Sequence, residues 1–323
     1  MSFSVWAVED LSKDNKNQVE SLEDSINKLS DEIKKLSASL KPVNSAFTPK
    51  IKRIFIEYGR AKGEINDLAN DFLGQSPRGL GKTDQDSTRL GAQFSLTPRL
   101  SGSLSGSFNE GDSDITNSSV RSNTNSKGSY YSASLNYLIT PWLTGGFFLG
   151  KSNGHADSST NSFGVLQNSP RTEMDGSSQG LLLSAVLPIS DKIFINLSPS
   201  YTTNIIKQKF PANNGDPELS QRYRLSLVNL DANFNYLFTQ PNIIITGGAT
   251  GHLVQHETQT MVNGVFGGIL PLTASRSDWS TVYLRARYIH PSLYEIYASA
   301  STELGNDVYA NNKVYSLGIA KSF

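Results

Sequence analysis

From residue 88 to the end of the chain, apolar and polar residues alternate. Tyr131, Ala133, Leu135, Tyr137 and Ile139 alternate with polar neighbours, and the same pattern covers 228–238. A period of two predicts strands with one apolar and one polar face. Eleven segments show it: 88–97, 100–109, 128–139, 142–151, 177–187, 192–206, 222–238, 242–256, 277–289, 293–303 and 312–323.

The connections between these segments alternate in length. The short ones mostly contain proline and lie at 97–99, 140–142, 188–191, 239–241 and 290–292. The long ones are rich in Asn, Ser, Gly and Asp and lie at 110–127, 152–176, 207–221, 257–276 and 304–311. Short turns on one side and long loops on the other are typical of outer-membrane barrels, which close because lipid tolerates no open sheet edge.

The second face of each strand decides between a membrane barrel and a soluble one. It carries Asn, Ser, Thr, Arg and Glu in strand after strand, which suits a wet or plugged lumen. We therefore predict an N-terminal α-helical heptad segment followed by an all-β, transmembrane, up-and-down antiparallel barrel of about 12 strands. Eleven is an odd count and bacterial barrels are even, so we expect one more strand within 50–81.

Two sets of apolar residues near the start are spaced three and four apart. This spacing predicts helices with a narrow coiled-coil seam, and Pro42 and Pro49 lie between the two sets. A helical hairpin, a homo-oligomeric stalk and a helix lodged in the pore all fit. The seam residues are Val19, Leu22, Ile26, Leu29, Ile33, Leu36 and Leu40, then Ile51, Ile54, Tyr58, Ala61, Ile65, Leu68 and Phe72.

Composition supports the same division of the chain. Residues 1–72 hold 23 of the 58 charged residues but only 2 of the 26 glycines. We therefore expect a helical segment over 1–75, a linker over 76–87 and the barrel over 88–323. The formal net charge of zero argues against a nucleic-acid partner, and the lack of cysteine excludes disulfides and Cys-ligated metals.

The polar faces of the predicted strands place several charged residues in the lumen. If a turn lies at 290–292, Arg287 comes opposite Glu295, and we expect an ion pair there. An open pore with these arginines would weakly prefer anions. The lumen candidates are Arg89, Asp231, His252, Arg285, Arg287 and Glu295.

The last strand ends on an aromatic residue. Tyr315, Leu317, Ile319 and Phe323 share one face and Gly318 lies on the other. The segment resembles the terminal strand signal read by the outer-membrane barrel assembly machinery, although Lys321 stands where that signal has an apolar residue.

Residues 88–323 resemble the translocator barrels of autotransporters, with Tyr-, Ser- and Gly-rich strands, an upstream helix and the Gly318-to-Phe323 ending. The resemblance implies that a helix around 51–72 threads the pore and joins an exported segment. The competing resemblance is to porins with a periplasmic coiled coil, in which the heptads would trimerise and the barrel would pass small solutes.

Catalytic and metal sites find little support in the sequence. Ser152-Asn153-Gly154-His155 resembles the Ser-Asn-Gly stretch of outer-membrane phospholipases, but Gly150 stands where that site needs a histidine base. His252 and His256 would lie about 13 Å apart along one strand face, too far to share a metal. We expect no catalytic residues, metal or cofactor, and no enzyme.

The expected location is the outer membrane of a Gram-negative bacterium. Met1–Val8 has no basic start and too short an apolar stretch for a signal peptide, so the sequence of an exported protein is expected here as a mature form, a fragment or a recombinantly expressed portion. Expected partners are outer-membrane lipid, the barrel assembly machinery and, through the heptads, further copies of the chain.

Overall fold

The computed structural model describes residues 49–67, 79–116, 120–162, 165–168, 171–210, 219–263, 269–272, 278–305 and 309–323. The chain divides into two units, Met1–Pro49 and Lys50–Phe323. The described residues contain no helix long and apolar enough to span a membrane. They form one antiparallel sheet.

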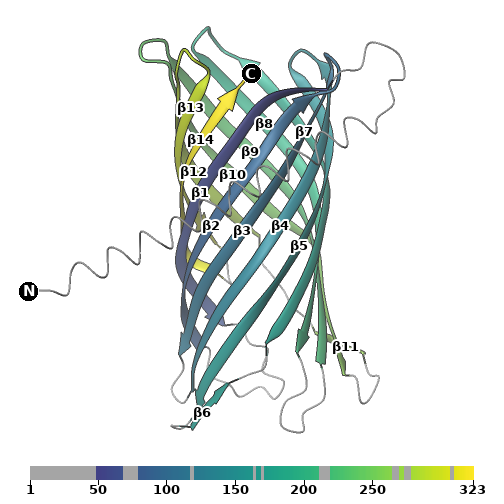
Figure 1. The fold of residues 1–323 in the computed structure, drawn as a ribbon. Coiled ribbons are helices and arrows are strands. Elements are labelled where there is room, and N and C mark those ends of the chain that lie inside the picture. Colours follow the sequence, from purple (N-terminus) through teal and green to yellow (C-terminus); the bar gives the residue numbers. More distant parts are fainter. Residues whose placement is uncertain are drawn as a thin grey trace, which may run out of the picture. The chain divides into compact units, whose positions relative to one another are not determined.

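Twelve strands close this sheet into a barrel (Figure 1). Two more, β6 and β11, are short and extend β5 and β10 at the end that carries the long connections. The strands are β1 (Lys50–Asp67), β2 (Gly79–Ser95), β3 (Leu100–Thr116), β4 (Val120–Thr140), β5 (Leu143–Ser162), β6 (Val165–Asn168), β7 (Thr172–Pro188), β8 (Ile193–Phe210), β9 (Leu219–Phe238), β10 (Ile243–Asn263), β11 (Ile269–Leu272), β12 (Trp279–Ile289), β13 (Tyr294–Leu304) and β14 (Tyr309–Ser322).

All eleven predicted strands are present, and the missing twelfth is β1, inside the range where it was expected. The barrel therefore begins at Lys50, and the prediction that it begins at 88 is wrong. The expected linker over 76–87 falls largely within β2.

The second heptad set is wrong as a helix. Ile51, Ile54, Tyr58 and Ile65 lie in β1, while Leu68 and Phe72 fall outside the described residues. In β1, Ile54, Ile56 and Tyr58 face outward and alternate with inward Arg53, Phe55 and Glu57, so the period of two overrides the spacing of three and four. The first set, Val19–Leu40, also lies outside the described residues, and its coiled coil stays a prediction.

The barrel closes where β1 pairs with β14. The ladder runs from Arg53 opposite Ser322 to Ile65 opposite Tyr309, with one irregularity near Lys62. The amide of Phe323 donates a hydrogen bond to the carbonyl of Lys52 at 3.0 Å. The even strand number thus brings the start and the end of the barrel to the same rim, the rim of the short turns (upper rim in Figure 1).

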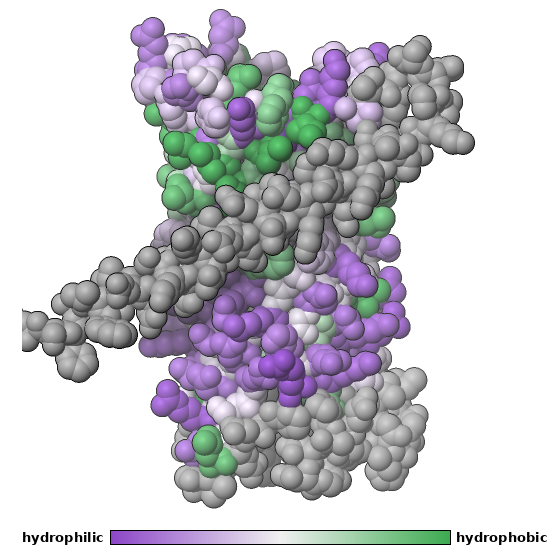
Figure 2. Space-filling view, in the orientation of Figure 1, coloured by the Kyte–Doolittle hydropathy of each residue, from purple (hydrophilic) through white to green (hydrophobic). Residues whose placement is uncertain are grey.

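The outer surface is divided along the strands. Near the short turns it carries a band of exposed apolar side chains, which we call the apolar belt (Figure 2). Aromatic residues mark both edges: Tyr137, Trp142 and Tyr294 near the turns, and Tyr58, Phe108, Tyr131, Tyr201 and Tyr315 at the far edge. About ten residues of each strand lie in the belt, which matches the length needed to cross a bilayer.

Beyond the belt the strands continue. Much of the sequence expected to be long loops is strand, including 110–116 of β3 and 152–162 of β5. Both faces are polar there, and cross-strand pairs such as Asn125 with Asp112 and Lys127 with Glu110 hold the sheet. We call this part the projecting half. Alternation of apolar and polar residues cannot identify strands surrounded by water on both sides.

Two kinds of cross-strand side-chain pair recur on the lumen face. Hydroxyls meet at 2.7–2.9 Å, as in Ser103 with Ser134 and Ser299 with Ser316. Aromatic rings lie over glycines, a pairing that fills the gap left by the missing side chain. A Cβ on Gly318 would come within 2.2 Å of the Tyr297 ring, and the same relation joins Phe55 to Gly91, Phe148 to Gly180 and Tyr283 to Gly248.

Candidate functional site

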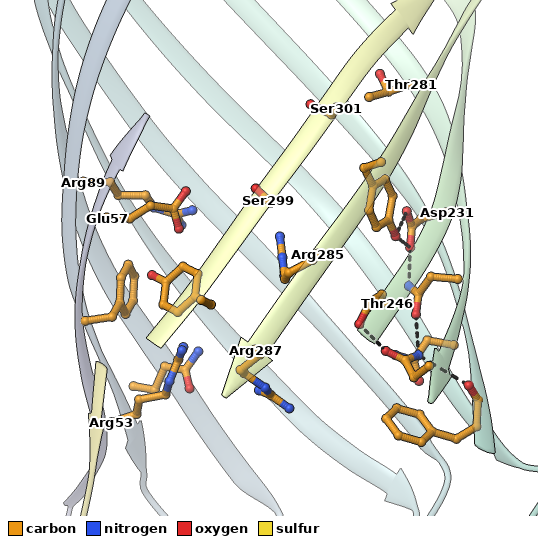
Figure 3. Close-up of a pocket in the computed structure, with 18 residues that line it drawn as sticks. Arg53, Glu57, Arg89, Asp231, Thr246, Thr281, Arg285, Arg287, Ser299 and Ser301 are labelled. Carbon is orange, nitrogen blue, oxygen red and sulfur yellow. Dashed lines mark hydrogen bonds between the residues drawn. The ribbon is translucent and has the colours of Figure 1, made fainter. Parts of the chain in front are cut away.

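A cavity of about 680 Å³ opens in the lumen within the height of the apolar belt. Side chains from β1, β2, β8–β10, β12 and β13 line it, because the inward residues of neighbouring strands share one level (Figure 3). We call it the lumen cavity. Its two sides differ in charge, which sets what it can bind.

One side is an arginine wall. Arg53, Arg89, Arg285 and Arg287 all point into the cavity (Figure 3). The guanidinium of Arg53 lies 5.6 Å from the ring centroid of Phe55, and that of Arg89 lies 5.4 Å from the same ring. Stacking on an aromatic face favours a cation and orients its guanidinium.

Glu295 neutralises part of this wall. Its Oε2 lies 3.0 Å from Arg53 and 3.7 Å from Arg287, and its Oε1 accepts a hydrogen bond from Ser322. The expected pair with Arg287 is present, but Arg287 is in register with Tyr297 and Glu295 with Ile289, so the contact is diagonal. The closer partner, Arg53, was missed because its strand was assigned to a helix.

The opposite side is a polar ladder along β9. Asp231 accepts hydrogen bonds from Thr250 at 2.7 Å, Tyr283 at 2.9 Å and Asn233 at 2.9 Å. Asn235 donates to Asn233 at 2.7 Å and accepts from Thr246 at 2.7 Å. Each group on this ladder is held by its neighbours, so the ladder presents a fixed, net-acidic surface to the arginines.

His252 belongs to the same network. One ring nitrogen lies 2.8 Å from Asn229 Oδ1 and the other 3.1 Å from Thr281 Oγ1, and the ring stacks on Trp279 at 4.7 Å. Both nitrogens are occupied, which makes His252 a structural lumen residue. All six predicted lumen residues therefore face inward: Arg89, Asp231, His252, Arg285, Arg287 and Glu295.

Ser152 and His155, the residues of the phospholipase-like stretch, lie on opposite faces of β5. Ser152 and His155 are three residues apart on β5, so Ser152 faces the lumen and His155 the outside. His256 was expected on the same strand face as His252, and this is wrong. A bulge between Val254 and His256 turns His256 outward, opposite Ser226.

The terminal strand has the expected faces. Tyr315, Leu317, Ile319 and Phe323 are exposed on the outside, and Gly318 lies in the lumen beneath Tyr297. Lys321 reaches the phenol oxygen of Tyr294 at 3.2 Å and lies 5.6 Å from the Phe323 ring centroid. At the edge of the belt its amine can reach water while its stem covers apolar surface.

Known structures share this fold, although no protein-family model and no curated protein matches the chain. The translocator domain of autotransporter NalP from Neisseria meningitidis matches with TM-score 0.59 and 12% identity, covering 94% of this chain and 98% of that one. The transport unit of the autotransporter AIDA-I from Escherichia coli gives TM-score 0.60 and 12% identity over 89% and 94%.

The chain has the fold of the autotransporter translocator barrels. An outer-membrane channel from Pseudomonas putida F1 is also similar, with TM-score 0.51 and 12% identity over 88% of this chain and 100% of that one. At these identities the likeness concerns the fold alone.

Proposed function

We propose that the barrel is an outer-membrane translocator and anchor of the autotransporter type, which carries the residues before Lys50 through or into its lumen. The observation behind the proposal is the position of β1. Its first residues lie at the short-turn rim. Arg53 is the fourth residue of β1 and already points into the lumen cavity.

The preceding segment suits this role. Nine residues separate the heptad positions Val19–Leu40 from β1. A helix over those 22 heptad residues would be about 33 Å long, close to the thickness of a bilayer core. Residues 1–48 carry eight Asp and Glu against six Lys, so acidic groups are available to the arginine wall. The short turns, the start of β1 and the end of β14 then face the periplasm.

Conductance tests the proposal. The full chain and a variant lacking residues 1–48 are inserted into planar bilayers. If the segment occupies the lumen, the full chain stays closed and the deletion opens a stable pore. Equal conductance of the two proteins would contradict the proposal.

Cross-linking gives an independent readout, because the chain has no cysteine. One cysteine replaces Ser299 on the lumen side of β13 and a second replaces Ile33. Oxidation or a short bifunctional reagent should join them within one chain. The matched control moves the first cysteine to Ala300, which faces outward, and should give no product.

A solute channel is the second candidate, favoured by the open cavity with its excess of arginines. In that case the heptads assemble several copies beneath the membrane. The detergent-corrected mass should then show an oligomer that becomes a monomer when Ile26, Leu29 and Ile33 are changed to Asn. The pore should prefer anions, and a reversal potential that indicates cations would contradict it.

A further inference from the structure

A group of cations lies on the outer face of β8 and β9, just beyond the apolar belt. Lys207, Arg222 and Arg224 are all exposed there, and we call them the basic patch. Lys207 and Arg222 are in direct register, and Arg224 is the next outward residue on β9. Like charges directly opposite each other destabilise a sheet, so an anion bound at this patch would relieve the repulsion.

The height of the patch on the barrel is set by its neighbours. Arg224 is opposite Ile205, and Val228, four residues nearer the short turns, is opposite Tyr201 at the belt edge. Four strand residues span about 13 Å. Arg224 therefore lies about 13 Å along the strand from the belt edge, and Lys207 and Arg222 lie about 20 Å from it, which places all three on the headgroup side of the hydrocarbon.

Several other cations on the outer face differ, because each of them is paired with a carboxylate within the chain. Arg60 lies 2.7 Å from Asp84, Lys127 lies 2.6 Å from Glu110, and Arg171 lies 2.9 Å from Asp157.

No carboxylate among the described residues lies within 4.0 Å of the basic patch. Asp175 is opposite Lys207, and Glu173 is opposite the neighbouring Lys209, each on β7. On β10, the strand on the other side of β9, His256 faces outward opposite Ser226. The carboxylates of β7 are in register with the two lysines, whereas no carboxylate of the described strands is in register with Arg222 or Arg224.

We propose that the basic patch binds the phosphate groups of lipid headgroups in the outer leaflet. Arginine offers a planar fork of donors to phosphate, and lysine adds a point charge. The belt directly beneath accepts the acyl chains of the same lipid. The site is independent of what the lumen carries and rests only on the short turns facing the periplasm.

The test measures binding of diphosphorylated lipid A to the full chain in discs of neutral lipid. The probe set also contains the dephosphorylated lipid with the same acyl chains and free inorganic phosphate. The variant combines Lys207→Gln, Arg222→Gln and Arg224→Gln. The control combines Lys127→Gln, Arg60→Gln and Arg171→Gln, which removes the same residue types from ion-paired positions.

Wild type and control should bind the phosphorylated lipid alike, and the patch variant about a hundredfold more weakly, since each basic residue near an anionic surface contributes about a fivefold factor. Three outcomes would overturn the proposal: unchanged binding by the patch variant, equal loss in the control, or equal binding of the dephosphorylated lipid. Competition by free phosphate at the concentration of the lipid would instead define a soluble-anion site.

Folding is checked by the heat-dependent gel mobility of each variant. If the triple variant does not fold, Arg222→Gln alone decides the matter, because it leaves Lys207 and Arg224 in place. It should weaken binding about fivefold, and an unchanged affinity would overturn the proposal.

Discussion

The belt and the projecting half are built from the same strands and the same backbone ladder, yet different forces hold them. In the belt the outward side chains are apolar and the surrounding lipid offers no hydrogen bonds, so every strand must pair. In the projecting half water competes for each backbone group, and side-chain pairs such as Asn123 with Asp114 hold the sheet. The same ladder is obligatory in one half and supported by side chains in the other.

This difference should appear most strongly when a charge is placed on each outer face. Leu284 lies in the belt on β12 and is 58% exposed, so Leu284→Arg should lower the free energy of unfolding by about 3 kcal/mol in lipid. Asn153→Arg on the projecting outer face of β5 should change it by less than about 0.5 kcal/mol. Denaturant unfolding of both variants in vesicles is the measurement, and equal losses would place Leu284 outside the bilayer.

Ion pairs should show the next largest contrast. Glu295 has only 9% of its side chain exposed and forms ion pairs with Arg53 and Arg287. Glu295→Gln therefore removes the negative charge that these two lumen cations share. We expect a loss of about 2 kcal/mol in unfolding free energy. Glu110→Gln removes an exposed partner of Lys127 and should lie within error of wild type. A stable Glu295→Gln protein would show that water in the lumen screens the arginines.

Glycine substitutions compare a crowded site with an open one. Gly318→Ala would drive a methyl into the Tyr297 ring and should cost about 1–2 kcal/mol by displacing that ring. Gly247 faces outward with nothing within 4 Å of an added Cβ, so Gly247→Ala should be neutral or slightly stabilising. The measurement is the melting temperature of the two variants. Equal melting temperatures would mean that the ring over Gly318 moves freely.

The smallest effect should come from acid titration of the projecting half. The Arg60 guanidinium holds the pKa of Asp84 below its ordinary value. A carboxylate with a lowered pKa stabilises the folded state above its ordinary pKa near 4, and this contribution disappears as the pH falls through the lowered value. The free energy of unfolding of the wild type should exceed that of Asp84→Asn by less than about 1 kcal/mol at pH 7, and the two should be equal at pH 2. A difference that persists at pH 2 would assign the effect to packing.

The sequence predicts the belt well because lipid imposes an alternation on it. Leu230, Phe234 and Leu317 appear as outward residues from the pattern alone, and the alternate positions on such strands identify lumen residues such as Asp231 and Arg285. The strand segments beyond the belt were expected to be loops, because neither of their faces has to be apolar.

The first strand shows a different limit. Ile51, Ile54 and Tyr58 fit a heptad and also a strand, and the true period is visible only when Ile56 is counted among the outward residues. Contacts between distant strands were equally hidden. The pair of Arg53 with Glu295 joins residues 242 apart, and no local pattern could predict it.

The seam between β1 and β14 has a consequence for how the barrel forms. Arg53 pairs with Ser322, so the first and last strands must find each other across nearly the whole length of the barrel sequence. Until β14 has paired with β1, the sheet keeps two unpaired edges, which invite association with other strands. Contacts of such long range also form slowly. The ring thus closes only when β14 has joined β1, and the seam between them protects both of these edges at once.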